Sequence, residues 1–156
     1  MFLYETFPSK LIMVALEAED KDEVFEEMVD QFCQVEDCGS RDEILEALLE
    51  REAKMSTGIH KGIAVPHGKS TAVENIHGIL GISRKGIDYD ALDGQPVYIL
   101  FMLLVPKEDS EMHLRLLKRL AGLLDNQDFC KEILAHNDPR SVNGVIRKFE
   151  DDFLAS

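Results

Sequence analysis

The class of fold is decided by nine consecutive hydrophobic residues, Val97-Tyr98-Ile99-Leu100-Phe101-Met102-Leu103-Leu104-Val105. This run is less than half as long as the roughly 20 residues that a membrane-spanning helix needs. Its length suits a β-strand, and a strand without alternating polar residues is typically buried on both faces. We therefore expect residues 97–105 to form a central strand that helices cover on each side.

Extended and helical patterns alternate around this strand. A second strand is expected at residues 76–83, joined to the central one by a segment whose Asp93-Gly94 pair suits a tight turn. Residues 11–16 form a further short extended segment. Apolar residues recur every three or four positions elsewhere, which predicts helices at residues 21–33, 41–54, 111–124, 128–135 and 141–153. Residues suited to helix N-caps precede three of them: Asp20, Ser40 and Ser110.

These elements fit one domain that spans residues 1–156. A chain of this length is within the usual size of a single domain, and folding can bury well over half of the surface that the unfolded chain exposes. The sequence contains neither an internal repeat nor a linker long enough to divide it. The expected fold class is therefore α/β, a mixed sheet with helices on its faces.

The charge of the chain restricts its partners. Seventeen Lys and Arg stand against thirty Asp and Glu, which gives a formal charge of −13 at pH 7. Such a charge opposes binding to the phosphates of nucleic acid or to an anionic membrane surface. A basic protein is the natural partner, although solubility alone explains the acidity equally well.

The cysteines and the N-terminus indicate the compartment. Cys33, Cys38 and Cys130 are an odd number without a CxxC pair, which favours neither a disulfide framework nor a zinc ribbon. The N-terminus lacks a cationic stretch followed by an apolar signal core. We expect reduced thiols in a cytoplasmic protein that is not inserted into a membrane.

The least generic stretch of the sequence runs from Ser56 to Lys69 and contains Pro66-His67-Gly68. Proline keeps the residue before it extended, and glycine permits a sharp exit. His67 is therefore expected at the end of a strand, where another protein can reach it. A neutral imidazole is a nucleophile near physiological pH, but the tripeptide alone would also suit an ordinary turn.

The sequence lacks the common motifs for metal binding and for nucleotide binding. His60 and His67 are seven residues apart, with neither an HxxxH helix pair nor a nearby cysteine to indicate a metal site. The patterns GxxxxGK(S/T) and GxGxxG are absent, which removes the common nucleotide-binding loops. We therefore expect no metal and no diffusible cofactor.

The stretch from Ser56 to Lys69, preceded by Leu49-Glu50-Arg51-Glu52, resembles the fructose, mannitol and nitrogen-regulatory class of enzyme IIA domains of the sugar phosphotransferase system, the EIIA type-2 domains. The resemblance extends to residues 86–89, 93–97 and 113–117, so it covers nearly the whole chain. It implies an α/β sandwich with a mixed sheet. It also implies that His67 receives a phosphoryl group from a phosphocarrier protein and passes it on.

The resemblance also implies functional roles for Arg51 and His113, which match two further positions of the family. A guanidinium and a second imidazole near a phosphohistidine would stabilise the charge on the transferring group. His113 also falls in the first turn of an expected helix, where free backbone N–H groups favour an anion. Without the resemblance, a solvated arginine and a capped histidine would explain both residues. His60 departs from the family, which has a small or polar residue there, and its role stays open.

Two functions are compatible with this resemblance. In the first, an HPr-like carrier phosphorylates His67, and the group then passes to a cysteine or histidine of a IIB domain in sugar transport. In the second, the domain is a nitrogen-branch regulator whose phosphorylation state controls binding to transporters or kinases. The intact set of His67, Arg51 and His113 argues against a third reading, a domain that has lost transfer.

Overall fold

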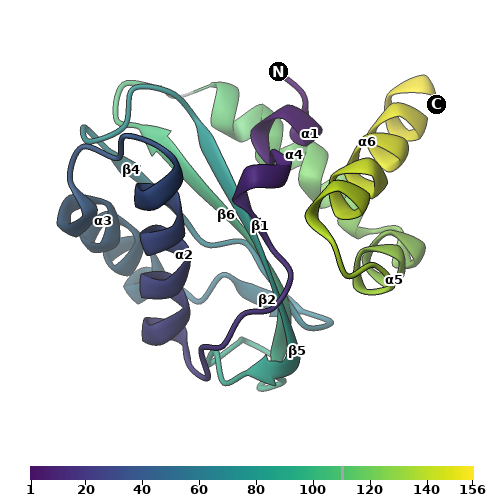
Figure 1. Cartoon of the computed structure of the whole chain (residues 1–156), viewed down its shortest axis with the longest axis horizontal. Coiled ribbons are helices and arrows are strands. Elements are labelled where there is room, and N and C mark those ends of the chain that lie inside the picture. Colours follow the sequence, from purple (N-terminus) through teal and green to yellow (C-terminus); the bar gives the residue numbers. More distant parts are fainter. Residues whose placement is uncertain (110) are drawn as a thin grey trace.

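One mixed β-sheet lies between two layers of helices (Figure 1). The structure is a computed structural model that describes residues 1–109 and 111–156, with every side chain among them except that of His60. The strands of the sheet are β1 (Ile12–Met13), β2 (Gly58–His60), β3 (Ile63–Ala64), β4 (His67–Ser70), β5 (His77–Ile87) and β6 (Val97–Pro106). Their order is β1-β5-β6-β3-β2, and β4 also pairs with β6. Both parallel and antiparallel pairs occur, which confirms the mixed sheet.

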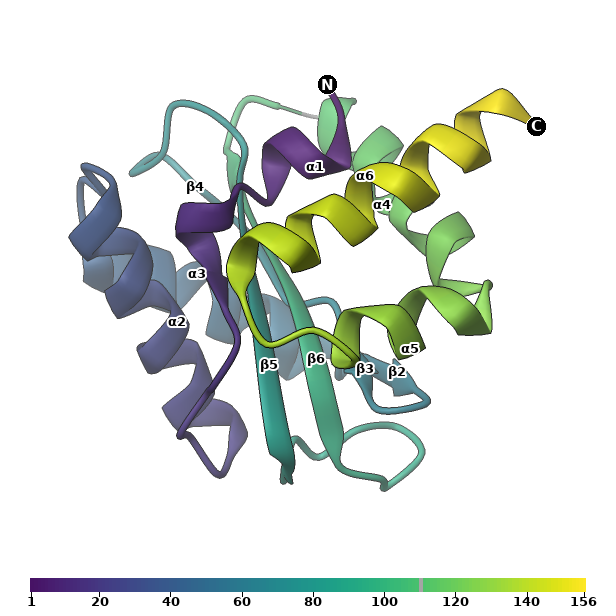
Figure 2. The same cartoon turned by 45° about the vertical axis from the view of Figure 1, so that its right-hand side comes forward.

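Helices cover both faces of the sheet. Figure 2 shows α2 and α3 on one face and α1, α4, α5 and α6 on the other. Their bounds are Leu3–Thr6 for α1, Lys21–Val35 for α2, Arg41–Lys54 for α3, Met112–Leu124 for α4, Gln127–Leu134 for α5 and Pro139–Ala155 for α6. A 3-10 helix, Ser9–Leu11, leads into β1. Within the two described ranges, no helix combines the length and the apolar character needed to cross a membrane.

Strand β6 is the central strand expected from residues 97–105. Leu100 and Met102 pack into the core beneath α2 and α3. The alternate side chains of Phe101 and Leu103 pack into the second core, beneath α1 and α4 to α6. From Ile99 to Val105, successive side chains of β6 enter opposite cores. Both faces of the strand are therefore buried, and its residues are apolar without alternation.

The helices follow their sequence patterns closely. All five predicted helices are present, and α1 is an additional short one. The side chains of Asp20 and Ser40 each accept a hydrogen bond from the backbone N–H three residues later, which confirms these two N-caps. The predicted cap Ser110 lies outside the described residues. The first amide of α4, that of Met112, donates to the carboxylate of Asp109 at 3.0 Å.

The cysteines correct an expectation. Cys33 and Cys38 form a disulfide, whereas the sequence favoured reduced thiols. Cys33 lies near the end of α2, and the chain turns back after the helix, so the two Cα atoms are 4.9 Å apart and within bonding reach. The CxxC criterion misses such a pair because the approach depends on how the chain leaves the helix. Among the described residues, Cys130 is the free cysteine.

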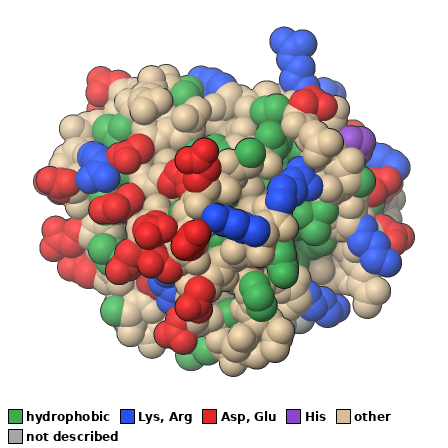
Figure 3. Space-filling view, turned by 60° about the horizontal axis from the view of Figure 1, so that its bottom comes forward, with side chains coloured by type: hydrophobic (Ala, Val, Ile, Leu, Met, Phe, Trp, Pro, Cys, Tyr) green, Lys and Arg blue, Asp and Glu red, His purple; other side chains and the backbone are tan. Residues whose placement is uncertain are grey.

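Acidic side chains gather on one side of the molecule, as the space-filling view shows (Figure 3). This is the side of α2 and α3, whose sequences are rich in Asp and Glu. Lys and Arg side chains lie mainly toward the other side of the same face. The net negative charge is therefore unevenly distributed, and a basic partner would meet it at α2 and α3.

A buried carboxylate joins the two ends of the chain. Glu150 in α6 has no exposed surface. Its oxygens accept hydrogen bonds from the backbone N–H of Leu3 at 2.7 Å and of Tyr4 at 3.2 Å, and from Arg119 Nη1 at 3.1 Å. The first amides of α1 thus find their acceptor on the last helix of the chain.

Candidate functional site

His67 lies just after a break in the pairing along β6. Strand β3 ends at Ala64, and β4 begins at His67; both run parallel to β6, with His67 opposite Leu103. Pro66 occupies the break between them, where its missing N–H is tolerated, and its carbonyl accepts from Leu103 N at 2.9 Å. The imidazole was expected at the end of a strand, but it belongs to the first residue of a second short strand, β4, because the chain pairs with β6 again after Pro66.

Gly68 does not make the sharp exit that the sequence suggested. It is a buried residue within β4, and its φ lies outside the positive range. A side chain here would place its Cβ 3.0 Å from the backbone of both Ala47 and Leu48 in α3. Glycine is thus suited to this position because it lets α3 pack closely against β4, and α3 is the helix that carries Arg51.

The hydrogen bonds of His67 define which ring nitrogen can react. Nδ1 lies 3.0 Å from the carbonyl oxygen of Val65. Because a carbonyl oxygen only accepts, Nδ1 must carry the proton in this contact. Nε2 therefore holds the lone pair, and the geometry presents it as the nucleophilic atom.

Arg51 points its guanidinium at that same atom. Its Nε donates to His67 Nε2 at 3.3 Å, and its Nη1 donates to the carbonyl of Met55 at 2.9 Å. The second contact holds the guanidinium in place at the end of α3. A phosphoryl group on Nε2 would lie directly against this cation, which suits the charge of its oxygens.

His113 joins Arg51 and His67 around one cavity of about 300 Å³, lined by Ala47, Glu50, Arg51, Lys54, His67, Gly68, Lys69 and His113. His113 is the second residue of α4, in its first turn as predicted. Burial lowers the pKa of the His113 imidazole below its ordinary value, and the ammonium of Lys69 acts in the same direction. The structure thus brings all three predicted site residues together and adds Lys54 and Lys69 to their surroundings.

A second cavity, of about 200 Å³, adjoins His67 on its apolar side. It is lined by Arg51, Thr57, Ile59, Val65, His67, Leu117, Leu120, Ala121 and Leu124. Leu114 and Met55 belong to the exposed large hydrophobic residues of the chain, at 59% and 60% exposure. An apolar surface around a polar reactive atom suits contact with another protein more than contact with a small polar substrate.

Burial lowers the pKa of His67 below its ordinary value, and the nearby positive charge of Arg51 adds to this effect. The hydrogen bond to Val65 and the negative charge of Glu52 act in the opposite direction without cancelling it. The imidazole consequently stays neutral at physiological pH. A neutral ring is the form in which Nε2 can attack a phosphorus atom.

Acidification should therefore destabilise the fold through His67. The unfolded chain protonates this imidazole near pH 6.5, whereas the folded chain does so only at lower pH. The resulting stability is fully present above about pH 6.5 and is lost as the pH falls below it. In urea unfolding at pH 7.5 and pH 5.5, the wild type should lose more stability than His67→Gln. Equal losses in the two proteins would contradict the lowered pKa.

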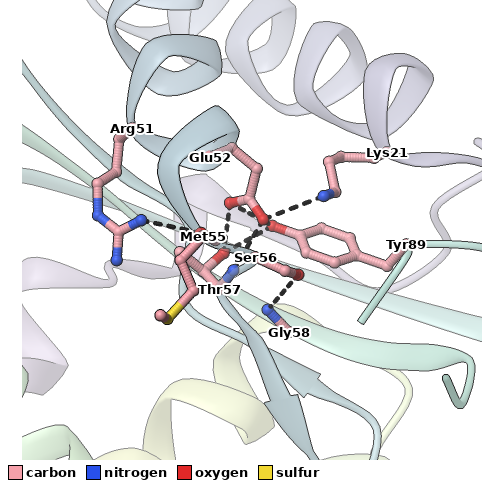
Figure 4. A network of polar contacts seen from close by, with 8 residues as sticks. All are labelled: Lys21, Arg51, Glu52, Met55, Ser56, Thr57, Gly58 and Tyr89. Atoms are coloured by element: carbon pink, nitrogen blue, oxygen red, sulfur yellow. Dashed lines mark hydrogen bonds and ion pairs between the residues drawn. The ribbon is translucent and has the colours of Figure 1, made fainter. Parts of the chain in front are cut away.

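A buried polar network that was not predicted lies beside the site. Glu52, the residue after Arg51, is 6% exposed and contacts Lys21, Thr57 and Tyr89 (Figure 4). The signal was present, because Glu52 continues the helical spacing of the buried stripe of α3, where an apolar residue is expected. Burial raises the pKa of the Tyr89 phenol well above its ordinary value, so it remains a donor.

Two other histidines lie elsewhere in the sheet. The centroid of the His77 ring is 4.9 Å from that of Phe32, with the two planes tilted by 55°, and the side chain of His60 lies outside what the structure describes. Across residues 1–109 and 111–156, no cluster of three His, Cys, Asp or Glu side chains could hold a metal ion.

Comparisons with known proteins agree on one family. The family model described as "Phosphoenolpyruvate-dependent sugar phosphotransferase system, EIIA 2" matches residues 5–149. The fructose-specific EIIABC component of the phosphotransferase system from Bacillus subtilis is 33% identical over 150 residues, which are 96% of this chain but only 24% of that protein. A nitrogen regulatory protein from Bradyrhizobium diazoefficiens is 33% identical over 135 residues, 86% of this chain and 88% of that protein.

A solved structure shares the fold. The crystal structure of the nitrogen regulatory protein IIA-Ntr from Neisseria meningitidis superposes with a TM-score of 0.84 at 29% sequence identity. The superposition covers 92% of this chain and 98% of that one. The α/β fold with a mixed sheet flanked by helices, expected from the sequence, is thereby confirmed.

Proposed function

This chain belongs to the EIIA 2 family of the phosphoenolpyruvate-dependent sugar phosphotransferase system, and on that premise we propose that it carries a phosphoryl group covalently on His67. The donor is a histidine-phosphorylated HPr-like protein. The acceptor in sugar transport is a IIB domain. Membership of the family supports phosphoryl transfer in general, and the geometry of the site supports the choice of residue.

The observation that carries the proposal is the pair of hydrogen bonds on one imidazole. The carbonyl of Val65 takes the Nδ1 proton, and Arg51 donates to Nε2 at 3.3 Å. This arrangement leaves one reactive nitrogen, with a cation fixed beside it.

Transfer of the phosphoryl group from the carrier to His67 needs no cofactor. The N–H of Arg51 Nε turns from His67 Nε2 to an oxygen of the incoming phosphoryl group. The freed lone pair of Nε2 forms a bond to phosphorus while the bond from phosphorus to the carrier's imidazole nitrogen breaks, and that nitrogen regains its electron pair. The proton stays on Nδ1, which donates it to the carbonyl of Val65. Arg51 and His113 stabilise the charge on the equatorial oxygens, and neither acts as a base. The reverse geometry releases the group to the next protein.

Residues 1–156 act as one domain in this proposal, located in the cytoplasm and needing neither metal nor diffusible cofactor. The imidazole lines a cavity with the apolar side chains of Ile59, Leu117 and Leu124, which suits docking of a protein donor. The acidic helices α2 and α3 complement a basic partner and oppose nucleic acid.

The second candidate function is regulation in the nitrogen branch. The observation that favours it is the similarity to a nitrogen regulatory protein over 88% of that protein's length. In this role the same phosphorylation on His67 occurs, but the two forms of the domain bind different transporters or kinases. Onward transfer to a IIB domain is then absent.

Intact-mass measurement tests both functions. The wild-type protein is incubated with phosphoenolpyruvate, enzyme I and HPr, and in parallel with the corresponding carrier proteins of the nitrogen branch. We expect the mass of one phosphoryl group to be added, and the adduct to be acid-labile, as a phosphohistidine is. Loss of the adduct upon addition of a IIB domain would favour sugar transport. An adduct that persists with IIB and changes binding to a transporter or kinase would favour regulation. No adduct with either set of carriers would reject the carrier role.

A further inference from the structure

Glu52 is a buried carboxylate with four hydrogen-bond or ion-pair partners (Figure 4). Its Oε1 accepts from the hydroxyl of Thr57 at 2.6 Å and from the hydroxyl of Tyr89 at 3.1 Å. Its Oε2 accepts from the backbone N–H of Thr57 at 2.7 Å and lies 3.2 Å from Lys21 Nζ. Each oxygen thus faces two donors, which suits a carboxylate that only accepts.

A continuous path of hydrogen bonds leads from Glu52 to the reactive imidazole. Glu52 binds the N–H of Thr57, the carbonyl of Thr57 accepts from Val65 N at 3.0 Å, and the carbonyl of Val65 takes the Nδ1 proton of His67 at 3.0 Å. The N–H and the carbonyl of Thr57 belong to successive peptide groups joined at its Cα, and the same holds for Val65. The path therefore acts by fixing the position of the backbone at Thr57 and Val65, and with it the carbonyl that accepts from the ring.

The path fixes a carbonyl that would otherwise lie in a weakly held segment. Val65 precedes Pro66 in the gap between β3 and β4, where no ladder hydrogen bond from a Pro66 N–H is possible. The N–H of Val65 is instead held by Thr57, and Thr57 is held twice by Glu52. The position of the Val65 carbonyl, and with it the proton on Nδ1, depends on this anchor.

We propose that Glu52 is a positioning residue for His67: through Thr57 and Val65 it holds the imidazole in the tautomer that leaves Nε2 free to accept the phosphoryl group. Lys21 and Tyr89 hold the carboxylate in turn. This proposal rests on the proposed carrier function for its effect on rate, but its effect on the tautomer does not. Arg51 and Glu52 thus act from adjacent positions of α3 on opposite nitrogens of one ring.

The test variant is Glu52→Met. The methionine side chain has a similar length but offers no oxygen, so the backbone N–H and the hydroxyl of Thr57 both lose their acceptor. We expect the anchor on Thr57 to loosen. Nitrogen-detected NMR of the imidazole should then show a mixture of tautomers in place of the Nδ1–H form, and the pKa of His67 should fall because a raising charge is lost. Phosphorylation should slow by about 10- to 100-fold, the usual effect of removing a group that orients a functional imidazole.

Two further variants separate positioning from general effects. Glu46→Gln removes the same formal charge from an exposed position on α3 and should leave the His67 tautomer, pKa and rate unchanged. The double variant Lys21→Met with Glu52→Met removes both charges of the buried pair, so no ammonium is left without its partner. The altered tautomer should persist in it. Recovery of the wild-type tautomer would show that the excess charge of Lys21, and not the lost anchor, caused the change, and would overturn the proposal.

The NMR measurement requires no phosphoryl donor. If no carrier phosphorylates the wild type, the carrier function fails, yet the tautomer in Glu52→Met still decides the role of Glu52. A folded Glu52→Met variant, checked by circular dichroism, with unchanged tautomer and pKa would overturn the proposal even if phosphorylation of the wild type is normal.

Discussion

Replacing His67 by alanine is expected to abolish phosphorylation of this protein completely. The variant lacks the Nε2 atom that accepts the group, and a neighbouring imidazole cannot substitute for it because His113 is not paired with Arg51 in the way that His67 is. The measurement is intact mass after incubation with phosphoenolpyruvate and the two sets of carrier proteins. The adduct seen on the wild type should be missing, not merely reduced.

The matched control is His77→Ala. His77 is a half-buried imidazole at the start of β5, outside both cavities that adjoin His67. This variant should be phosphorylated at the wild-type rate. Normal labelling of His67→Ala would reassign the acceptor, and loss of labelling in both variants would point to a defect of folding, which circular dichroism would reveal.

Replacing Arg51 by alanine is expected to slow phosphorylation by about 100- to 1000-fold, the loss typical of removing one donor that stabilises developing charge. The guanidinium lies beside Nε2 and is held by the carbonyl of Met55, so only its Nε–H must turn from the lone pair to a phosphoryl oxygen when the group arrives. Quenched-flow or gel-based rates of labelling would measure the effect. Final labelling at long times should still reach one group per chain.

Two further variants provide rates with which the rate of Arg51→Ala can be compared. Arg51→Lys keeps the charge but loses the fork of N–H donors, and it should recover only part of the rate. Arg115→Ala removes an exposed arginine of α4 whose ion pair with Glu111 is on the surface, and it should have little effect. An Arg51→Ala rate within a factor of two of the Arg115→Ala rate would remove Arg51 from the site.

Much of the fold follows from local sequence patterns. The apolar run at residues 97–105 identified the central strand, and the caps at Asp20 and Ser40 marked the starts of α2 and α3. Strands β2 and β4 escaped prediction because each is short, and β4 also takes its partner, β6, from a distant segment. Gly68 was misread for the same reason: its constraint comes from the approach of α3 and not from its own φ.

The residues of the site could be predicted from the sequence, but their hydrogen bonds could not. His67, Arg51 and His113 were identified by motif and resemblance, and the structure shows that they share one cavity. The hydrogen bonds that give each nitrogen of His67 its role come from residues 2 and 16 positions away in the sequence. Glu52 was missed because a glutamate in a charged helix normally faces water, and only its spacing distinguishes it.

The contact between Glu150 and the first amides of α1 has a consequence for the order of folding. The hydrogen bond between Glu150 and Leu3 spans 147 positions of the sequence. During synthesis from the N-terminus, the first amides of α1 therefore have no Glu150 acceptor until almost the whole chain has been made. Until then, Leu3 and Phe7 also lack the residues of the second core that bury them. Closing so long a loop is slow relative to local helix formation. The N-terminal segment should accordingly be among the last parts of the molecule to acquire protection from hydrogen exchange during refolding.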